Sequence, residues 1–212
     1  MEHHRSFREL ASMVESLSAA EYVIQPDLID EHQRNSRCAT KKRAPLDIYL
    51  SYLGEKTHRT VAESLYNALE EKRIRTFLSK GGNEFSAKQR QAMHQSGINS
   101  VVFSKEYCSS LAHGHLDELV EMVNLKNTRG TPLIPIFYDI DPDDVRNQTG
   151  PFAEVFDMHE NKSQVDCEKV RQWRKALAKA ADSPRWVFRS AEHGYYAPVS
   201  LAISCIKFFR GK

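Results

Sequence analysis

Short apolar runs alternate with amphipathic stretches from residue 46 onward, and no other feature of the sequence limits the possible folds as strongly. The four runs are LDIYLSY (46–52), IRTFL (74–78), SVVFS (100–104) and PLIPIFY (132–138). Each is short and almost continuously apolar, which is typical of strands whose two faces are both covered. We therefore expect a parallel sheet between layers of helices.

The stretches between the runs carry apolar residues at helical spacing. Predicted helices cover residues 59–72, 84–95 and 116–126. In the first of them Val61 and Leu65 fall on one face together with other apolar residues. The order of strands and helices, with right-handed crossovers, predicts a doubly wound α/β sheet.

The pattern continues beyond the fourth run. Residues 152–160 and 165–181 have helical patterns, and residues 186–188 are predicted to form a fifth strand at the edge of the sheet. We therefore expect the α/β domain to cover residues 44–190.

Two flanking segments surround this domain. Residues 1–43 are predicted to be an N-terminal extension, in which a short amphipathic helix precedes a polar linker. Residues 191–212 contain a final apolar helix, which we expect to pack on the α/β domain.

The charge balance argues against a dedicated nucleic-acid binder. The 212 residues include 30 Lys and Arg against 28 Asp and Glu, a net charge of +2, whereas nucleic-acid binders usually carry a clear positive excess. The basic cluster at residues 41–43 is short, and we interpret it as part of a solvated linker. A nucleic-acid partner is therefore not expected.

Hydropathy and cysteine usage favour an intracellular protein. No stretch approaches the ~18 uninterrupted apolar residues of a membrane helix, and the first residues lack the apolar segment of a secretory signal. The four cysteines lie far apart and form no CxxC pair, so neither a disulfide framework nor a four-ligand zinc site is expected. We expect no membrane contact and a location in the cytoplasm, with the nucleus as a second possibility.

Four loops follow the carboxyl ends of the predicted strands, where doubly wound sheets bind their ligands. They cover residues 53–56, 79–83, 105–114 and 139–146. None of them carries GxGxxG, GxxxxGKS/T or GxSxG, so dinucleotide cradles, P-loops and nucleophile elbows lack their usual sequence signals. The third strand ends in FSKEY, which lacks the Asp that a phospho-receiver needs there.

The start of the predicted third helix gathers His113, His115, Asp117 and Glu118. The H-x-H spacing suits zinc on a strand, but at a helix start the two histidines point about 200° apart. A third ligand with suitable spacing is missing, so we expect no metal. The two carboxylates either complement the helix dipole or present Glu118 to the ligand-binding edge of the sheet.

A single carboxylate at this edge limits the reactions that the site could catalyse. It cannot support a glycosidase that needs two carboxylates. The nicotinamide–ribose bond of NAD is different, because its leaving group is already a cationic pyridinium that needs no acid. A carboxylate there has only to orient the ribose and stabilise an oxocarbenium-like transition state. Glu118 is therefore a candidate catalytic residue.

Motifs from residue 46 to about residue 186 resemble, in the right order, the plant form of the TIR (Toll/interleukin receptor) domain. LDIYLSYLGEKTHRT resembles the plant pattern DVFLSFRGEDTR, and LDELVEM resembles CLDELVxI. PLIPIFYDIDPDDVRNQTGPFAEVFDMHE resembles VIPIFYDVDPSDVRxQxGxFxxxFxxHE. The resemblance implies a five-stranded, parallel, flavodoxin-like sheet with helices on both faces, in agreement with the alternation pattern. It implies a TIR-only protein with an N-terminal extension.

The resemblance also implies immune signalling inside the cell. Plant members self-associate, and many cleave NAD to nicotinamide and ADP-ribose or cyclic ADP-ribose products that trigger defence or cell death. NAD is then the substrate, no cofactor is implied, and the expected partners are other TIR domains in homo- or hetero-oligomers. The catalytic Glu of the family falls on Glu118. The residues that the resemblance places near NAD are Leu53, Gly54, Gly82, Glu84 and His115.

The chain departs from the family pattern around this site. The family's WCL before DEL is GHL here, RGED is LGEK, and the loop TFxDDxxLxxGxxI is a few residues shorter, as TFLSKGGNEF. The Ser-His pair of the family's first helix is replaced by Glu63 and Ser64. Two hypotheses follow. The first is an NAD glycohydrolase or ADP-ribosyl cyclase that is active on self-association, and the second is a TIR adaptor or decoy with weak or no catalysis.

Overall fold

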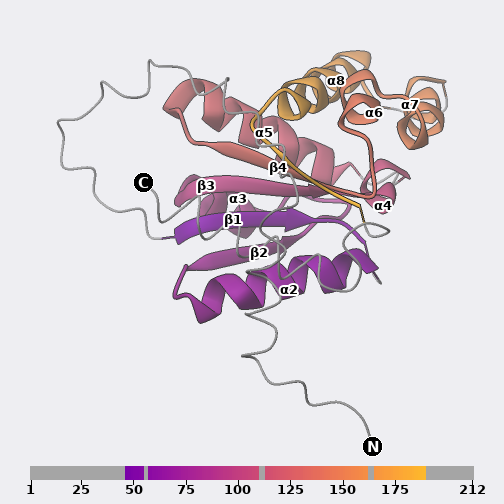
Figure 1. Ribbon diagram of the computed structural model, residues 1–212. Helices are drawn as coiled ribbons and strands as arrows, with labels where there is room; N and C mark the ends of the chain where they lie inside the picture. Colours follow the sequence, from indigo (N-terminus) through magenta and orange to yellow (C-terminus); the bar gives the residue numbers. More distant parts are fainter. Residues whose placement is uncertain (1–45, 55–56, 110–112, 162–164, 190–212) are drawn as a thin grey trace, which may run out of the picture.

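The computed structural model describes residues 46–54, 57–109, 113–161 and 165–189. Five strands form one sheet in the order β2-β1-β3-β4-β5 (Figure 1). All four neighbouring pairs are parallel. The strands are β1 (Leu46–Tyr52), β2 (Thr76–Lys80), β3 (Ser96–Phe103), β4 (Leu133–Tyr138) and β5 (Trp186–Phe188). The predicted fold class is confirmed, including the short edge strand.

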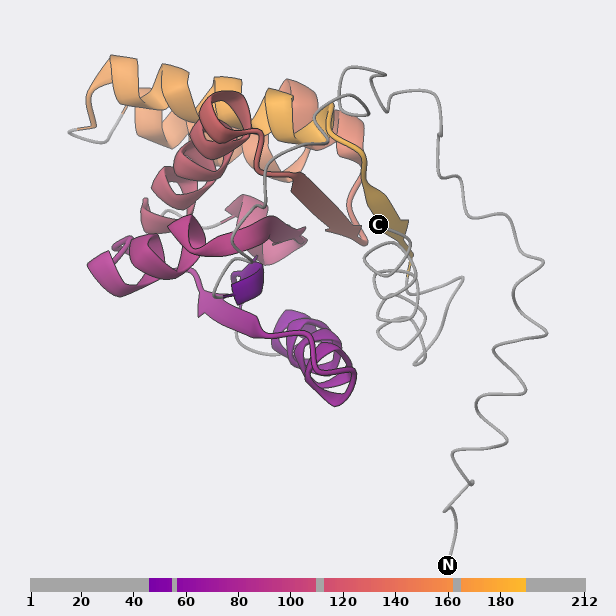
Figure 2. The same cartoon turned by 90° about the vertical axis from the view of Figure 1, so that its left-hand side faces the viewer.

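Helices cover both faces of this sheet. They are α2 (Thr57–Glu71), α3 (Ala87–His94), α4 (Lys105–Ser109), α5 (Gly114–Arg129), α6 (Pro142–Asn147), α7 (Pro151–Asn161) and α8 (Cys167–Ala181). Figure 2 shows α2 on one side of the sheet, and α3 and α5 on the other. The helices predicted in the N-terminal extension and in the C-terminal segment lie outside the described residues.

The strand period of two divides the apolar side chains between two cores. Along β1, Ile48 and Leu50 pack with Leu65 of α2 in the smaller core. Tyr49 points to the opposite face and belongs to the larger core, which α3, α5 and α8 cover. Trp173 of α8 is a member of this larger core and is only 1% exposed.

Four elements, β2, α3, β4 and α8, begin later than the sequence pattern predicts, and local hydrogen bonds explain the starts of α3 and β2. Helix α3 begins at Ala87 rather than residue 84, because Ser86 is its N-cap and forms a capping box with Gln89. Strand β2 begins at Thr76 rather than residue 74. Arg73 has a φ of 59°, and the amide of the next residue closes the end of α2 by donating to Leu69 O. This turn occupies the positions expected for the first strand residues.

Candidate functional site

The register of β1 and β2 places polar side chains together at the carboxyl ends of the two strands. Ser51 of β1 lies beside Ser79 of β2, and Tyr49 lies one pleat before Ser51 beside Phe77. Because alternate strand residues share a face, Tyr49, Ser51 and Ser79 all point to the side covered by α3 and α5. All three side chains are buried.

Glu118 of α5 reaches down to these hydroxyl groups. The Tyr49 hydroxyl donates a hydrogen bond to Glu118 Oε1, and Ser79 Oγ donates to the same oxygen at 2.9 Å. Ser51 Oγ donates to Glu118 Oε2 at 2.9 Å. The carboxylate is 1% exposed, so these three hydroxyls replace the water that would otherwise solvate it. We call Tyr49, Ser51 and Ser79 the hydroxyl ring.

The dipole of α5 does not explain how the buried carboxylate of Glu118 is stabilised. Helix α5 begins at Gly114, two residues before its predicted start, so Asp117 lies in the first turn and Glu118 lies beyond it. The dipole effect falls off within the first turn. The expectation that both acids lie in the first turn therefore holds for Asp117 only, and the hydroxyl ring is what satisfies Glu118.

Burial and hydrogen bonding act in opposite directions on the acidity of this group. Burial raises the pKa of Glu118 above its ordinary value, and the hydrogen bonds from the hydroxyl ring lower it by less. Burial, followed by the charge of Glu118, raises the pKa of Tyr49 far above its ordinary value. The Tyr49 hydroxyl therefore keeps its proton and acts as a donor.

The loop between β2 and α3, residues 81–86, lies directly on the start of α5. A Cβ atom on Gly114 would lie 2.6 Å from the backbone N and C of Glu84 and from Gly82 O. On the other side of the loop start, Gly81 N donates to Tyr52 O at 2.7 Å. This backbone packing requires glycine at Gly114, and it holds the loop against the first turn of α5, the helix that carries Glu118.

Four of the five predicted substrate contacts lie in the β2–α3 loop or in the residues that follow β1. Leu53 is 9% exposed and lies under Gly81, and Gly82 contributes its carbonyl to the packing on α5. Gly54 has a φ of 131°, a conformation that favours glycine. The side chain of Glu84 is exposed. All four stay predicted substrate contacts.

His115 faces the protein interior. Its side chain is 1% exposed, and its ring packs edge-on against Tyr107, with the ring centroids 4.5 Å apart. The Tyr107 hydroxyl donates to His115 O at 3.1 Å. In the described conformation the ring contributes to the core, and contact with NAD stays a prediction for this residue.

The sequence interpretation missed the hydroxyl ring and the residue that supports it. Gln89 of α3 donates to Ser79 Oγ at 2.9 Å. A signal was available, because Ser51 and Ser79 are polar residues near the ends of otherwise apolar strands, and Tyr49 carries a hydroxyl two residues before Ser51. Such groups are usually hydrogen-bonded when buried, and their spacing of two in β1 places Tyr49 and Ser51 on one face.

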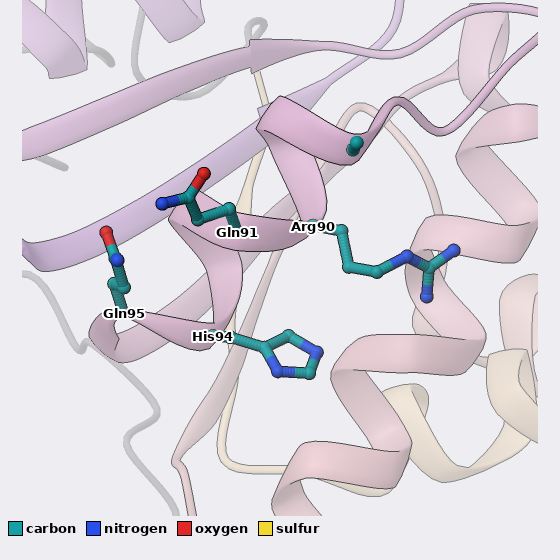
Figure 3. Close-up of a pocket in the computed structure, with 5 residues that line it drawn as sticks. Arg90, Gln91, His94 and Gln95 are labelled. Carbon is teal, nitrogen blue, oxygen red and sulfur yellow. The ribbon is translucent and has the colours of Figure 1, made fainter.

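A shallow hollow of about 490 Å³ lies along α3 and does not include Glu118. Its lining residues are Ala87, Arg90, Gln91, His94 and Gln95. Figure 3 shows Arg90 and His94 extending to one side of the helix and Gln91 and Gln95 to the other. His94 Nε2 lies 2.6 Å from Glu121 Oε1 of α5, so this surface joins two helices outside the buried site.

Two further classes of site have no support in the described part of the chain. Within residues 46–54, 57–109, 113–161 and 165–189, no group of three or more His, Cys, Asp or Glu side chains is arranged to hold a metal ion. In the same ranges, no helix combines the length and the apolar character that crossing a bilayer requires.

We expect the unfolding free energy of Glu118→Gln, compared with that of the parent at the same pH, to become larger as pH rises. Below the ordinary pKa of 4.5, Glu118 is protonated in both the folded and the unfolded chain. As pH rises toward the raised pKa of the folded state, the unfolded chain loses its proton first, and the parent loses folding free energy. Glutamine does not titrate, so the difference in unfolding free energy grows with pH.

Urea unfolding of parent and variant from pH 5 to pH 8 measures this difference. Glu154→Gln, at an exposed position of α7, is the matched control and should keep a constant difference. Parallel stability curves for Glu118→Gln and its parent would contradict the raised pKa.

Known proteins resemble this chain in sequence and in structure. The family model of the TIR domain matches residues 46–194. TMV resistance protein N of Nicotiana glutinosa is 38% identical over 148 residues, which are 68% of this chain and 13% of that protein. Disease resistance protein RPV1 of Vitis rotundifolia is 35% identical over 143 residues, which are 66% of this chain and 10% of that protein.

A solved structure extends the likeness to the fold. It contains the TIR domains of the activated Roq1 resistosome, described as directly recognizing the pathogen effector XopQ. The TM-score is 0.65 at 33% identity, over 76% of this chain and 98% of that chain. The chain spans only 10% to 13% of the length of the two resistance proteins above.

Proposed function

Because the chain belongs to the TIR domain family and has plant disease-resistance proteins among its relatives, we propose that it is an immune-signalling domain that cleaves NAD at Glu118 when it associates with other TIR domains. One observation carries this proposal. A buried carboxylate with a raised pKa lies at the carboxyl ends of β1 and β2, where doubly wound sheets bind ligands. Such perturbed groups concentrate at functional sites.

One carboxylate oxygen of Glu118 can still accept a further hydrogen bond, which a substrate could donate. Each carboxylate oxygen accepts about two hydrogen bonds. Oε1 already accepts from Tyr49 and Ser79, whereas Oε2 accepts only from Ser51 among the contacts described. A ribose hydroxyl of NAD would therefore bond to Oε2, while the hydroxyl ring holds the carboxylate in one orientation.

The chemistry then follows from the charge of this group. The bond between the ribose carbon and the nicotinamide nitrogen breaks, and its electron pair neutralises the pyridinium. The ionised Glu118 stabilises the positive charge that develops on the ribose. Water, or a nucleophilic nitrogen of the same NAD, then bonds to that carbon, its proton passes to the solvent, and ADP-ribose or a cyclic product results.

Access to Glu118 requires the β2–α3 loop to move. The carboxylate is 1% exposed, and the backbone of Gly82 and Glu84 lies on Gly114. We infer that association with a second TIR domain supplies the free energy for this movement. The partners are copies of this chain or other TIR domains, the substrate is NAD without a cofactor, and the location is the cytoplasm or nucleus.

Nicotinamide release by the purified chain at increasing concentration tests the proposal. We expect release to rise more steeply than in proportion to protein concentration, because only the associated chain is open. Glu118→Gln protein prepared in the same way measures the background. No release above that background at any concentration, with associated protein present by light scattering, would overturn NAD cleavage.

A second function is favoured by the closure of the site. The buried Glu118 and the tight packing of Gly114 under the loop suit an adaptor or decoy that binds TIR domains without catalysis. In that case Glu118→Gln would bind TIR partners and trigger defence as well as the parent does. Loss of signalling with intact binding would favour the enzyme.

A further inference from the structure

Gln89 joins the β2–α3 loop to the strand end beneath it. On the loop side, Gln89 Oε1 accepts from Ser86 N at 2.8 Å and from Ser86 Oγ at 2.7 Å. On the strand side, Gln89 Nε2 donates to Ser79 Oγ at 2.9 Å and to Lys80 O at 3.2 Å. One partly buried amide thus contacts both ends of the β2–α3 loop.

The orientation of this amide is fixed by its partners. A backbone N–H can only donate, so the atom that faces Ser86 N must be the amide oxygen. A carbonyl oxygen can only accept, so the atom that faces Lys80 O must be the amide nitrogen. Both ends give the same assignment.

The amide orientation sets the direction of the next hydrogen bond as well. Ser79 Oγ accepts from Gln89 Nε2, so its single hydrogen is available for Glu118 Oε1, 2.9 Å away. Gln89 therefore donates to Ser79, and Ser79 in turn donates to Glu118. Donors in such a chain polarise one another, which strengthens each bond.

We propose that Gln89 is a positioning residue that couples closure of the β2–α3 loop to the hydrogen bonding of Glu118, so that both are released together. When the loop lifts at Ser86 and Lys80, Gln89 loses its anchors and Ser79 loses the donor that directs its hydrogen toward Glu118. The part of this inference that concerns catalysis rests on the proposed NAD cleavage. The part that concerns loop closure does not.

A simpler role for Gln89 is the N-terminal capping box of α3, which it forms with Ser86. Glutamate fills that place as well as glutamine does. Gln89→Glu therefore keeps the acceptor for Ser86 but cannot donate to Ser79 or Lys80. It separates the two roles, because only the positioning role needs the amide donor.

Hydrogen exchange of the amides of residues 81–86, followed by mass spectrometry, measures loop closure without any substrate. We expect Gln89→Glu to speed this exchange by about 3- to 10-fold, the factor that loss of one or two hydrogen bonds gives. Exchange in β3 and β4 should stay unchanged. Gln91→Glu, an exposed position on the same helix, makes the same chemical change and should leave exchange in the loop as in the parent.

The pH profile of NAD cleavage gives a readout that a purely structural role would not move. Without the donor from Gln89, Ser79 no longer directs its hydrogen to Glu118, and this weakens one of the hydrogen bonds that lower the pKa of Glu118. We expect the acid limb of kcat to shift to higher pH in Gln89→Met, which removes the donor without adding a charge near Glu118, while KM falls because the loop opens more easily. Gln91→Glu should keep the parent profile.

The outcomes distinguish the two proposals. Faster loop exchange without nicotinamide release in any variant supports the coupling of Gln89 to the loop and overturns NAD cleavage. Loop exchange in Gln89→Glu equal to that in Gln91→Glu overturns the positioning role, whatever the activity. If Gln89→Glu does not fold, Gln89→Met is compared with Ser86→Ala: both disturb the capping box, but only Gln89→Met removes the donor to Ser79, so it must show faster exchange than Ser86→Ala.

Discussion

Glu118→Ala is expected to lower the rate of NAD cleavage by about 100-fold or more, the loss typical when a group that stabilises transition-state charge is removed. The alanine leaves the developing positive charge of the ribose without its counter-charge, and it leaves three hydroxyls without their acceptor. Nicotinamide release by concentrated protein measures the loss as kcat. Because burial raises the pKa of Glu118, parent activity should fall on acidification at a pH above the ordinary 4.5.

Glu121→Ala is the matched control for this prediction. Glu121 lies on the same helix, is 22% exposed, and pairs with Arg90 and His94 on the surface. We expect its activity to stay within about threefold of the parent, since exposed ion pairs contribute little. An equal loss in Glu118→Ala and Glu121→Ala would show that the first effect comes from a disturbed α5 rather than from the carboxylate.

Trp173→Ala is expected to destabilise the protein by about 3–5 kcal/mol, the usual cost of truncating a buried aromatic side chain. Trp173 fills the core between α8 and α5, and its Nε1 donates to Asp117 Oδ1 at 2.9 Å. Its ring also packs against His113, with the centroids 5.1 Å apart. Thermal unfolding followed by circular dichroism should show a Tm lower by roughly 10 °C.

Two variants separate the parts of this effect. Trp173→Phe keeps an aromatic ring but removes the donor to Asp117, so we expect about 1–2 kcal/mol of destabilisation. Arg171→Ala changes an exposed residue of α8 that pairs only with Glu168 among the ion pairs described, and should stay within about 0.5 kcal/mol of the parent. A Trp173→Ala protein as stable as Arg171→Ala would contradict the role of Trp173 in joining α8 to α5.

The fold was predictable because the alternation of apolar runs and helical patterns is local information. Strands β1, β3 and β4 were placed from their apolar letters alone, and even the three-residue β5 was expected at the sheet edge. The errors lie at element ends, as in β2 and α3. There the left-handed conformation of Arg73 and the Ser86–Gln89 capping box decide where an element begins.

The candidate site was only partly predictable. Glu118 was found from its position at the start of a helix after β3 and from the family resemblance. The hydroxyl ring was not found, because Tyr49 and Ser79 come from two strands whose register the sequence does not state. Gln89 was not found either, because a glutamine on a polar helix start carries no signal of a buried partner.

The sequence by itself determined the parallel sheet and the TIR family, and it singled out Glu118 as the candidate carboxylate, since periodicity and motif letters are properties of neighbouring residues. The tertiary structure alone decided that the Glu118 carboxylate is buried and that its pKa is raised. Strand pairing brings Ser51 beside Ser79, and the absence of a Cβ on Gly114 lets the β2–α3 loop settle on α5. Burial is a property of contacts between distant segments, and it is burial that raises the pKa of Glu118.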